Sequence, residues 1–309
     1  MRKTTLITLA LLIGSFFCLS DCAQHSDDTQ SKAGSTAGNL SSSNIGRDGA
    51  LMVLIPEGDF FMGDPGEDDV HYDENPCHTV YLDAFWIDCF EVTNRLYKRF
   101  IDETGHRAPS VDAEWAEPYN WKNNQYPQDK ADFPVVLVSW EDAVAYATWT
   151  GKRLPTEAEW EKAARGGVVK KNYPWGDEID GTRANHFTSI TSANELKPVG
   201  SFPATPYGLY DVAGNVWEWC NDWYGQTYYR YAPASNPRGP DQGLYRVFRG
   251  GAWINRGENL RCSERARNVP DHQSHIIGFR CARSVTGKQA DAHDNICYTD
   301  KTLFLKEKQ

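Results

Sequence analysis

Hydrophobic residues recur at helical spacing in three stretches of the chain. In residues 139–151, Ser139 and Asp142 form a Ser-x-x-acid start that can cap the first amides, and Gly151 supplies a stop. Residues 156–167 begin with a second start of this kind, carry Trp160 with small residues on one face, and end at paired glycines. The third stretch covers 93–103 and stops at Gly105. We expect three helices in these stretches.

Strand signals are shorter than the helical ones. Apolar, aromatic and branched residues gather at 52–55, 80–87, 245–248 and 278–282. Between them lie long segments rich in Pro, Gly, Asn and Trp, such as 107–133 and 166–208. Loops of this length are uncommon unless buried aromatic rings, disulfides or a metal fix them. The pattern therefore predicts little regular secondary structure.

The N-terminal pattern is that of a secretory signal. A positive start precedes an apolar run from Leu6 to Leu19, which is shorter than the roughly 20 residues that cross a bilayer. Residues 1–21 resemble a lipoprotein signal with Cys22 as the lipidation site, although Asp21 departs from that pattern. Ordinary cleavage and secretion is the alternative. We expect an exported, membrane-anchored protein facing the periplasm or the cell surface.

Polar composition sets the limits of the folded part. Residues 22–49 are almost without apolar side chains, which predicts a flexible linker. The body then runs over 50–284, and 285–309 is a polar C-terminal tail. The net charge is -10 over 309 residues, which argues against nucleic-acid binding by phosphate neutralisation. The 11 Trp, 15 Tyr and 13 Phe supply rings for a core or for a sugar or peptide site.

Cysteine and histidine give no metal motif by spacing. The cysteines beyond Cys22 permit up to three disulfides in an exported protein, with 15 connectivities, although some thiols could be buried and unpaired. These cysteines are Cys77, Cys89, Cys220, Cys262, Cys281 and Cys297. No CxxC pair occurs, so a zinc ribbon is excluded. His272 and His275 lie three residues apart, and we interpret them as part of a solvated loop.

Several segments, taken together and in order, resemble the formylglycine-generating enzyme family, also called the sulfatase-modifying factor domain. They begin at Ile55-Pro56-Glu57-Gly58 and continue through Phe85-Trp86-Ile87-Asp88, Gly151-Lys152-Arg153-Leu154-Pro155-Thr156-Glu157-Ala158-Glu159-Trp160, Tyr173-Pro174-Trp175-Gly176, Gly214-Asn215-Val216-Trp217-Glu218-Trp219, Arg249-Gly250-Gly251 and Gly278-Phe279-Arg280. The resemblance covers about residues 50–284. It implies an α+β fold related to C-type lectins, with little regular secondary structure.

The resemblance also implies a chemistry whose residues are altered in this chain. Active family members oxidise a cysteine of a client sulfatase with oxygen and copper, which two cysteines after an Arg-Gly-Gly-Ser segment hold. Here Ala252 replaces the serine, and Asn255 stands in the place of the first cysteine. Because a carboxamide is neither a thiolate ligand nor a redox group, copper is not expected. In relatives the disulfide partners of Cys262 and Cys281 fall at Ala164 and Ala147, so those pairings are absent.

A calcium site is implied by the resemblance at residues 211–218. Asp211 and Glu218 would supply carboxylates, and Gly214 and Val216 backbone carbonyls, which suits the oxygen-rich shell of Ca²⁺. The alternative is a capped turn whose acids face water. Without an oxidase site, the domain is expected to be a non-catalytic binding or scaffold module in the bacterial envelope.

The ligand surface is placed by the same resemblance. Arg249, Trp253, Asn255 and Arg261 are candidates to line a groove for a peptide, a glycan or an envelope protein. The alternative is that each of these residues is an ordinary part of the core or of the surface and binds no ligand. The rival function is an oxidoreductase of the formylglycine-generating type, maturing sulfatases with altered active-site chemistry.

Overall fold

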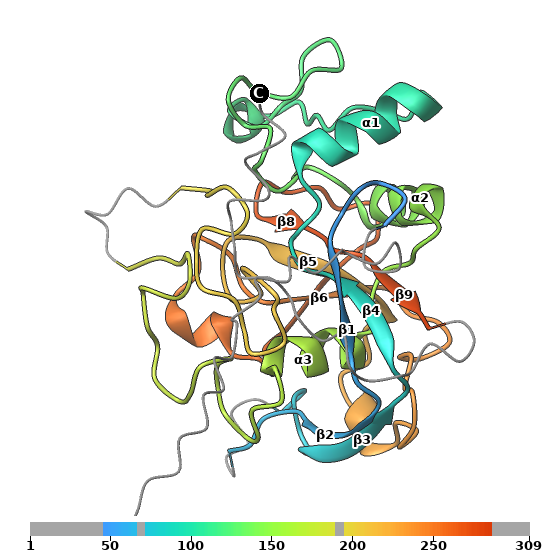
Figure 1. Ribbon diagram of the computed structural model, residues 1–309, viewed down its shortest axis with the longest axis vertical. Coiled ribbons are helices and arrows are strands. Elements are labelled where there is room, and N and C mark those ends of the chain that lie inside the picture. Colours follow the sequence, from blue (N-terminus) through green and yellow to red (C-terminus); the bar gives the residue numbers. More distant parts are fainter. Residues whose placement is uncertain (1–45, 67–71, 189–194, 286–309) are drawn as a thin grey trace, which may run out of the picture. The chain divides into compact units, whose positions relative to one another are not determined.

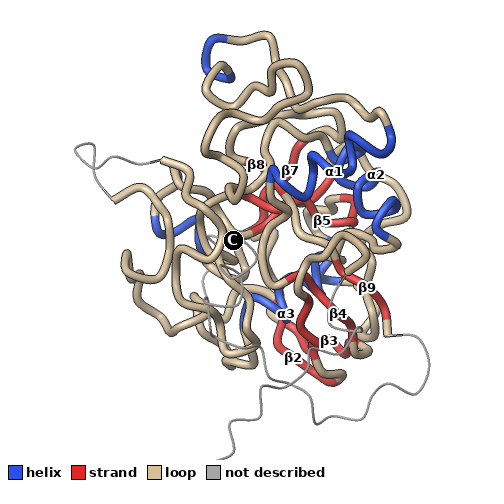
Figure 2. The backbone as a smooth tube through the Cα atoms, turned by 45° about the horizontal axis from the view of Figure 1, so that its top comes forward, coloured by secondary structure: helices blue, strands red, loops and turns tan. Residues whose placement is uncertain are grey.

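The computed structural model describes residues 46–66, 72–188 and 195–285, all of which belong to one unit, Leu40–Gln309. The expected signal at 1–21, lipidation at Cys22 and most of the linker lie outside the described residues, as does nearly all of the tail. No described helix is long and apolar enough to cross a membrane. Figure 2 shows that loops and turns make up most of the described chain, as the pattern predicts.

Three helices form where the capping signals place them. Helix α1 is Asn94–Thr104, α2 is Trp140–Thr150 and α3 is Glu157–Arg165. The capping boxes of α2 and α3 are both complete, and each of the three helices ends on a glycine in the left-handed conformation. These local signals fix the helix ends, because cap and stop act within a few residues of sequence.

The strands form three sheets within the described residues (Figure 1). β1, β4 and β9 form one antiparallel sheet, β2 and β3 form a hairpin, and the third sheet has the order β7-β6-β5-β8 with β5 and β8 parallel. Their bounds are Met52–Ile55 (β1), Gly58–Met62 (β2), His78–Leu82 (β3), Phe85–Asp88 (β4), Trp217–Trp223 (β5), Arg246–Arg249 (β6), Arg265–Asn268 (β7), Ile277–Gly278 (β8) and Ala282–Ser284 (β9).

One predicted strand proves to be two strands, because the run 80–87 is divided between β3 and β4, which pair with different partners. The strand predicted at 278–282 is wrong for most of its length: only its end residues belong to β8 and β9, and 279–281 are irregular. β2, β5 and β7 were not expected, because their side chains do not alternate cleanly between apolar and polar. All these strands depend on tertiary partners, which a short apolar run does not reveal.

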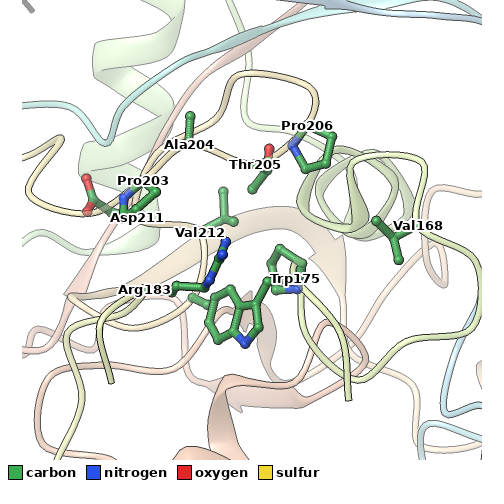
Figure 3. A pocket seen from close by; sticks show the side chains of 11 residues that line it. Val168, Trp175, Arg183, Pro203, Ala204, Thr205, Pro206, Asp211 and Val212 are labelled. Carbon is green, nitrogen blue, oxygen red and sulfur yellow. The ribbon is translucent and has the colours of Figure 1, made fainter. Parts of the chain in front are cut away.

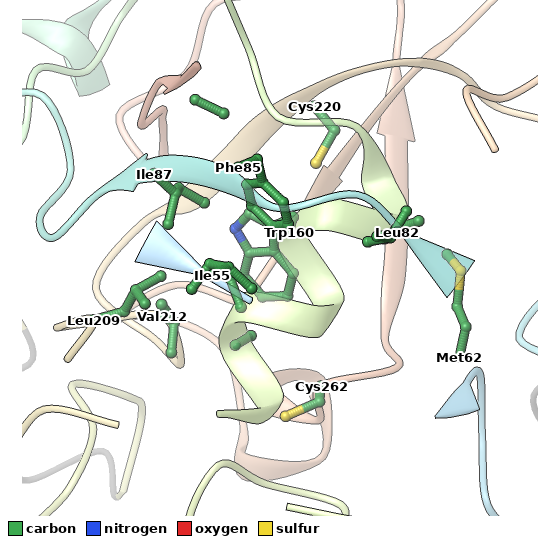
Figure 4. Close-up of a cluster of buried hydrophobic side chains, with 14 of the residues drawn as sticks. Ile55, Met62, Leu82, Phe85, Ile87, Trp160, Leu209, Val212, Cys220 and Cys262 are labelled. Atoms are coloured by element: carbon green, nitrogen blue, oxygen red, sulfur yellow. The ribbon is translucent and has the colours of Figure 1, made fainter. Parts of the chain in front are cut away.

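Helix α3 lies at the centre of the fold. All nine of its residues are buried, and it packs against β2, β3, β5 and β6. Trp160 is the centre of a hydrophobic cluster that includes Ile55, Phe85 and Val212 (Figure 4). The sequence predicts one buried face for this helix, whereas its charged side chains are buried as well.

Candidate functional site

Asn255 lies just beyond β6, in a turn that its own side chain holds together. Its carboxamide oxygen accepts hydrogen bonds from the indole Nε1 of Trp217 at 2.9 Å and from the amide of Ala252 at 3.0 Å. Its backbone N–H donates to the carbonyl of Ala252 at 2.8 Å. Asn255 therefore fixes a buried tryptophan and a tight turn. A carboxamide in this setting can position and bind, but it cannot carry a redox step.

Four rings from three segments meet beside this turn, and we call them the aromatic cluster: Trp115, Tyr119, Trp253 and His275. The ring of His275 lies 5.2 Å from Trp115, 5.2 Å from Tyr119 and 5.8 Å from Trp253, centroid to centroid. Trp115 is 46% exposed, whereas Trp253 and Tyr119 are partly buried. The cluster thus presents an open aromatic ring on a packed base.

The aromatic cluster carries two polar atoms without hydrogen bonds among the described residues. These are the indole Nε1 of Trp253 and Nδ1 of His275, both screened from solvent. Burial lowers the pKa of His275, so its imidazole is neutral near pH 7. Unsatisfied buried polar atoms of this kind call for a ligand or water as a partner. As the side chains stand, the cluster offers ring faces to a ligand, because both polar atoms are covered.

The sequence reasoning missed most of this cluster. His275 was expected in a solvated loop but stacks on Tyr119 in a partly buried position. The amide of Leu137 donates to the carbonyl of Ser274 at 3.0 Å, which holds the His275 loop against the fold. Trp115 and Tyr119 come from the long loop 107–133. The aromatic density of that loop was a usable signal, but nothing in the sequence indicated its partner.

Arg249 takes a different position from Trp253 and Asn255. It is fully buried and pairs with Glu157 at 2.6 Å and Glu161 at 2.7 Å, while Arg265 and Arg165 bind the same two glutamates. We call these five residues the Arg–Glu network. Burial alone would raise the pKa of Glu157, but the guanidiniums of Arg265 and Arg249 outweigh it and hold that pKa below its ordinary value.

Arg261 is also buried and does not line a ligand surface. Its guanidinium binds both carboxylate oxygens of Glu74 at 2.7 Å and one oxygen of Glu264 at 2.5 Å, and the residue is 7% exposed. The expectation that Arg249 and Arg261 line a ligand surface is therefore corrected: each is buried because acidic partners surround it. Of the four candidates, Trp253 and Asn255 remain.

The loop 211–218 is tied to a neighbouring strand-like segment. Gly214 has φ +84°, and a Cβ at this position would lie 2.2 Å from the carbonyl oxygen of Asn185. The amide of Asn215 also donates to that oxygen, at 2.9 Å. Only glycine allows this approach, so residue 214 has to be a glycine for the two segments to meet.

The two acids of the loop differ in what they bind. Both oxygens of Glu218 are bound by Arg280, at 2.7 and 2.8 Å, and one also accepts from the indole of Trp160. Oδ2 of Asp211 accepts from the amide of Gly200, whereas its Oδ1 is buried without a hydrogen bond among the described residues. Burial raises the pKa of Asp211 to about 6. Asp211 is thus the less satisfied of the two acids.

The predicted calcium set is only half matched by this geometry. Asp211 keeps a free oxygen, but the carboxylate of Glu218 is already neutralised by Arg280. Within the described ranges, no group of three or more His, Cys, Asp and Glu side chains is placed to hold a metal ion. Calcium at Asp211, Gly214, Val216 and Glu218 stays a prediction, and no chemistry is derived from it.

The cysteines of the described chain are unpaired thiols. They are Cys77, Cys89, Cys220, Cys262 and Cys281, all but Cys77 buried. Figure 4 shows Cys220 and Cys262 on opposite sides of α3. Burial raises the pKa of Cys262 to about 11, which keeps it a neutral thiol near pH 7. Cys297 lies outside the described residues.

Comparison with known proteins identifies the class. The fold, which is mixed helix and strand and related to C-type lectins, matches the solved structure of PvdO from Pseudomonas aeruginosa with a TM-score of 0.67. The two chains are 30% identical, and the match covers 77% of this chain and 95% of the other. The family model of the sulfatase-modifying factor enzyme 1-like domain matches residues 39–285. The chain belongs to this family.

Curated relatives carry more than one activity in their names. The formylglycine-generating enzyme of Streptomyces coelicolor is 38% identical over 279 residues, covering 75% of this chain and 88% of that enzyme. The serine/threonine-protein kinase pkn1 of Chlamydia caviae is 43% identical over 245 residues. That match covers 76% of this chain but only 38% of the kinase, so the chain spans well under half of that relative.

Proposed function

We propose that this chain is an exported, membrane-tethered binding module of the bacterial envelope, and that a peptide segment of an envelope protein lies on the aromatic cluster. The observation that carries the proposal is the position of the cluster beside Asn255. There the resemblance expects the redox cysteine, and the chain instead offers aromatic ring faces.

The chemistry of the nearby residues favours binding over oxidation. The carboxamide oxygen of Asn255 is committed to Trp217 and Ala252, and Cys262 is a buried thiol whose pKa is raised to about 11. Copper(I) prefers thiolates, which neither residue supplies near neutral pH. Exposed tryptophan and tyrosine rings, by contrast, are the common anchors of peptide recognition.

The test uses the purified full-length protein with arrayed peptides that tile the exported proteins of its own organism. We expect the wild type to retain specific peptides and the Trp115→Ala variant to lose them. Tyr231→Ala removes a ring that is 64% exposed outside the cluster, so it is the matched control and should bind as the wild type does. Retention by Trp115→Ala, or binding to arrayed glycans alone, would overturn the peptide assignment.

The oxidase alternative is tested on the same preparation. After loading with copper(I), a cysteine-containing sulfatase peptide is supplied, and both oxygen uptake and the mass of the peptide are followed. We expect no aldehyde product. Copper-dependent oxidation of the peptide that is abolished in Cys262→Ser would support the oxidoreductase hypothesis and refute the proposal of a non-catalytic module.

Export and tethering rest on the N-terminal sequence alone and are tested separately. In a bacterial host, the wild type and the Cys18→Ser control should fractionate with membranes, because Cys18 lies inside the expected signal. Cys22→Ser should be released as a soluble exported protein, because it lacks the lipid acceptor. Equal membrane association of both variants would exclude a lipid anchor at Cys22.

A further inference from the structure

A cavity of about 340 Å³ shares no residue with the aromatic cluster. Its lining comes from the two loops on either side of residues 189–194, and includes Trp175, Arg183, Pro203, Pro206 and Val212. Figure 3 shows Arg183 directed from the Trp175 side toward Val212, with Ala204, Thr205 and Pro206 opposite. The volume lies at the lower end of the range of small-molecule sites, about 300–1,000 Å³.

The aromatic wall of this cavity is held in place. The indole Nε1 of Trp175 donates to the carbonyl of Glu178 at 2.9 Å, and the ring stacks on the buried Tyr173 at 5.5 Å with an interplanar angle of 7°. The proline wall is held as well, because Gly166 lies so close to Pro206 that a Cβ would meet its ring at 2.7 Å. A ligand would therefore find the site largely formed.

Arg183 brings the only positive charge of the lining residues. Its side chain is 48% exposed, and its Nε donates to Oδ2 of Asp180 at 3.1 Å. Within the part of the chain that the structure describes, its two terminal nitrogens make no hydrogen bond. A guanidinium with free terminal N–H groups matches a carboxylate in bidentate geometry.

The surrounding charges select against a more highly charged ligand. Asp180 binds the same guanidinium, Asp211 belongs to the lining, and the chain carries a net charge of -10. Because Asp180 already binds Arg183, a phosphate dianion would bring a second negative charge that no lining residue can meet, so a monoanion is the favoured ligand. Trp175, Pro203, Pro206 and Val212 offer apolar surface for the rest of the ligand.

We propose that this cavity binds a small monocarboxylate with an aromatic body, the carboxylate on Arg183 and the ring against Trp175. The probe is N-acetyl-L-phenylalanine, and its uncharged amide is the matched control ligand. Binding to the full-length protein is followed by calorimetry and by saturation-transfer NMR. We expect the acid to bind with a Kd below about 10 mM, and the amide to bind at least about tenfold more weakly.

Variants assign the binding to the two residues. Arg183→Gln should weaken the acid at least about tenfold and leave the weak binding of the amide unchanged. Trp175→Leu should weaken both ligands, since the ring face is lost. Arg230→Gln removes an exposed arginine elsewhere and is the control. Thermal unfolding of each variant checks that it folds.

Three results would overturn the assignment: no binding of the acid up to about 10 mM, equal affinity for acid and amide, or unchanged affinity in Arg183→Gln. Phenyl phosphate binding more tightly than the acid would contradict the monoanion argument. Trp115→Ala should leave this binding intact. Failure here is thus distinguishable from failure of the proposed peptide site.

Discussion

The Arg–Glu network and the aromatic cluster both include a residue of the short segment 249–253, at the end of β6, yet the two residues have opposite surroundings. Arg249 goes into the core, where Glu157 and Glu161 neutralise it. Trp253, four residues on, packs its ring among others at a partly open surface and leaves its Nε1 without a partner among the described residues. The charged residue became structural, and the aromatic residue stayed available for binding.

This contrast has a physical cause. A guanidinium that is fully buried needs carboxylates around it, and those carboxylates neutralise its charge and hold it away from a ligand. A tryptophan buries most of its ring by packing and can still present a face or an N–H. A charged residue near a suspected site is therefore weaker evidence for binding than an aromatic one, unless its partners are known.

Breaking the network should give the largest effect. Arg249→Met leaves buried glutamate charge with fewer partners and should lower the free energy of unfolding by about 3–5 kcal/mol, measured by urea denaturation. Arg95→Met is the control, because its pair with Asp132 is half exposed, at 50% and 43%. It should cost less than about 1 kcal/mol. Equal losses would show that Arg249 carries no special structural role.

A buried acid with too few partners should respond to pH. Folding raises the pKa of Asp211 to about 6 through burial, so its contribution is fully present below the unfolded pKa and is lost as pH rises through about 6. Relative to Asp211→Asn, the wild type should lose on the order of 2–3 kcal/mol between pH 4 and pH 7.

The difference between the two unfolding curves isolates this carboxyl from the histidines, which titrate in the same range. Glu157 serves as the contrast, because its pKa is lowered. A constant difference across the range would contradict the burial argument. Bound calcium would also reduce the pH dependence of this stability difference. Repeating the titration with a chelator and with excess Ca²⁺ therefore tests the predicted metal site directly.

The turn at Asn255 should show a smaller cost. Asn255→Ala leaves the indole N–H of Trp217 and the amide of Ala252 without their acceptor, so the loss should be about 1–3 kcal/mol. Asn259→Ala, in the same segment, should stay within about 0.5 kcal/mol. If both variants were equally stable, Asn255 would not anchor the turn, and its side chain would be free for a ligand.

The smallest effect is expected at the exposed ring of the cluster. Trp115→Ala should cost less than about 1 kcal/mol in stability, because the ring is 46% exposed. Trp121, from the same loop, is 5% exposed, and its replacement by alanine should cost about 3–5 kcal/mol. A large loss at Trp115 would place it in the structural core and remove it from the binding surface.

The helices and the family follow from local features of the chain. Caps at Thr93, Ser139 and Thr156, and glycine stops, act within one turn, so the helix ends follow from local residues. The ordered motifs of the family likewise lie in short segments. The strands were harder to predict, since β2, β5 and β7 form only by pairing with remote parts of the chain.

The roles of the candidate site residues depend on contacts between remote parts of the chain. Arg249 meets Glu161 across 88 residues, and Arg261 meets Glu74 across 187. His275 joins Trp115 and Tyr119 from a loop that looked solvated. Burial and pairing depend on residues remote in sequence, and these decide whether a charge is neutralised or an aromatic face is left open. Local sequence patterns indicate which secondary structure a segment prefers, whereas the fold determines which side chains it contacts.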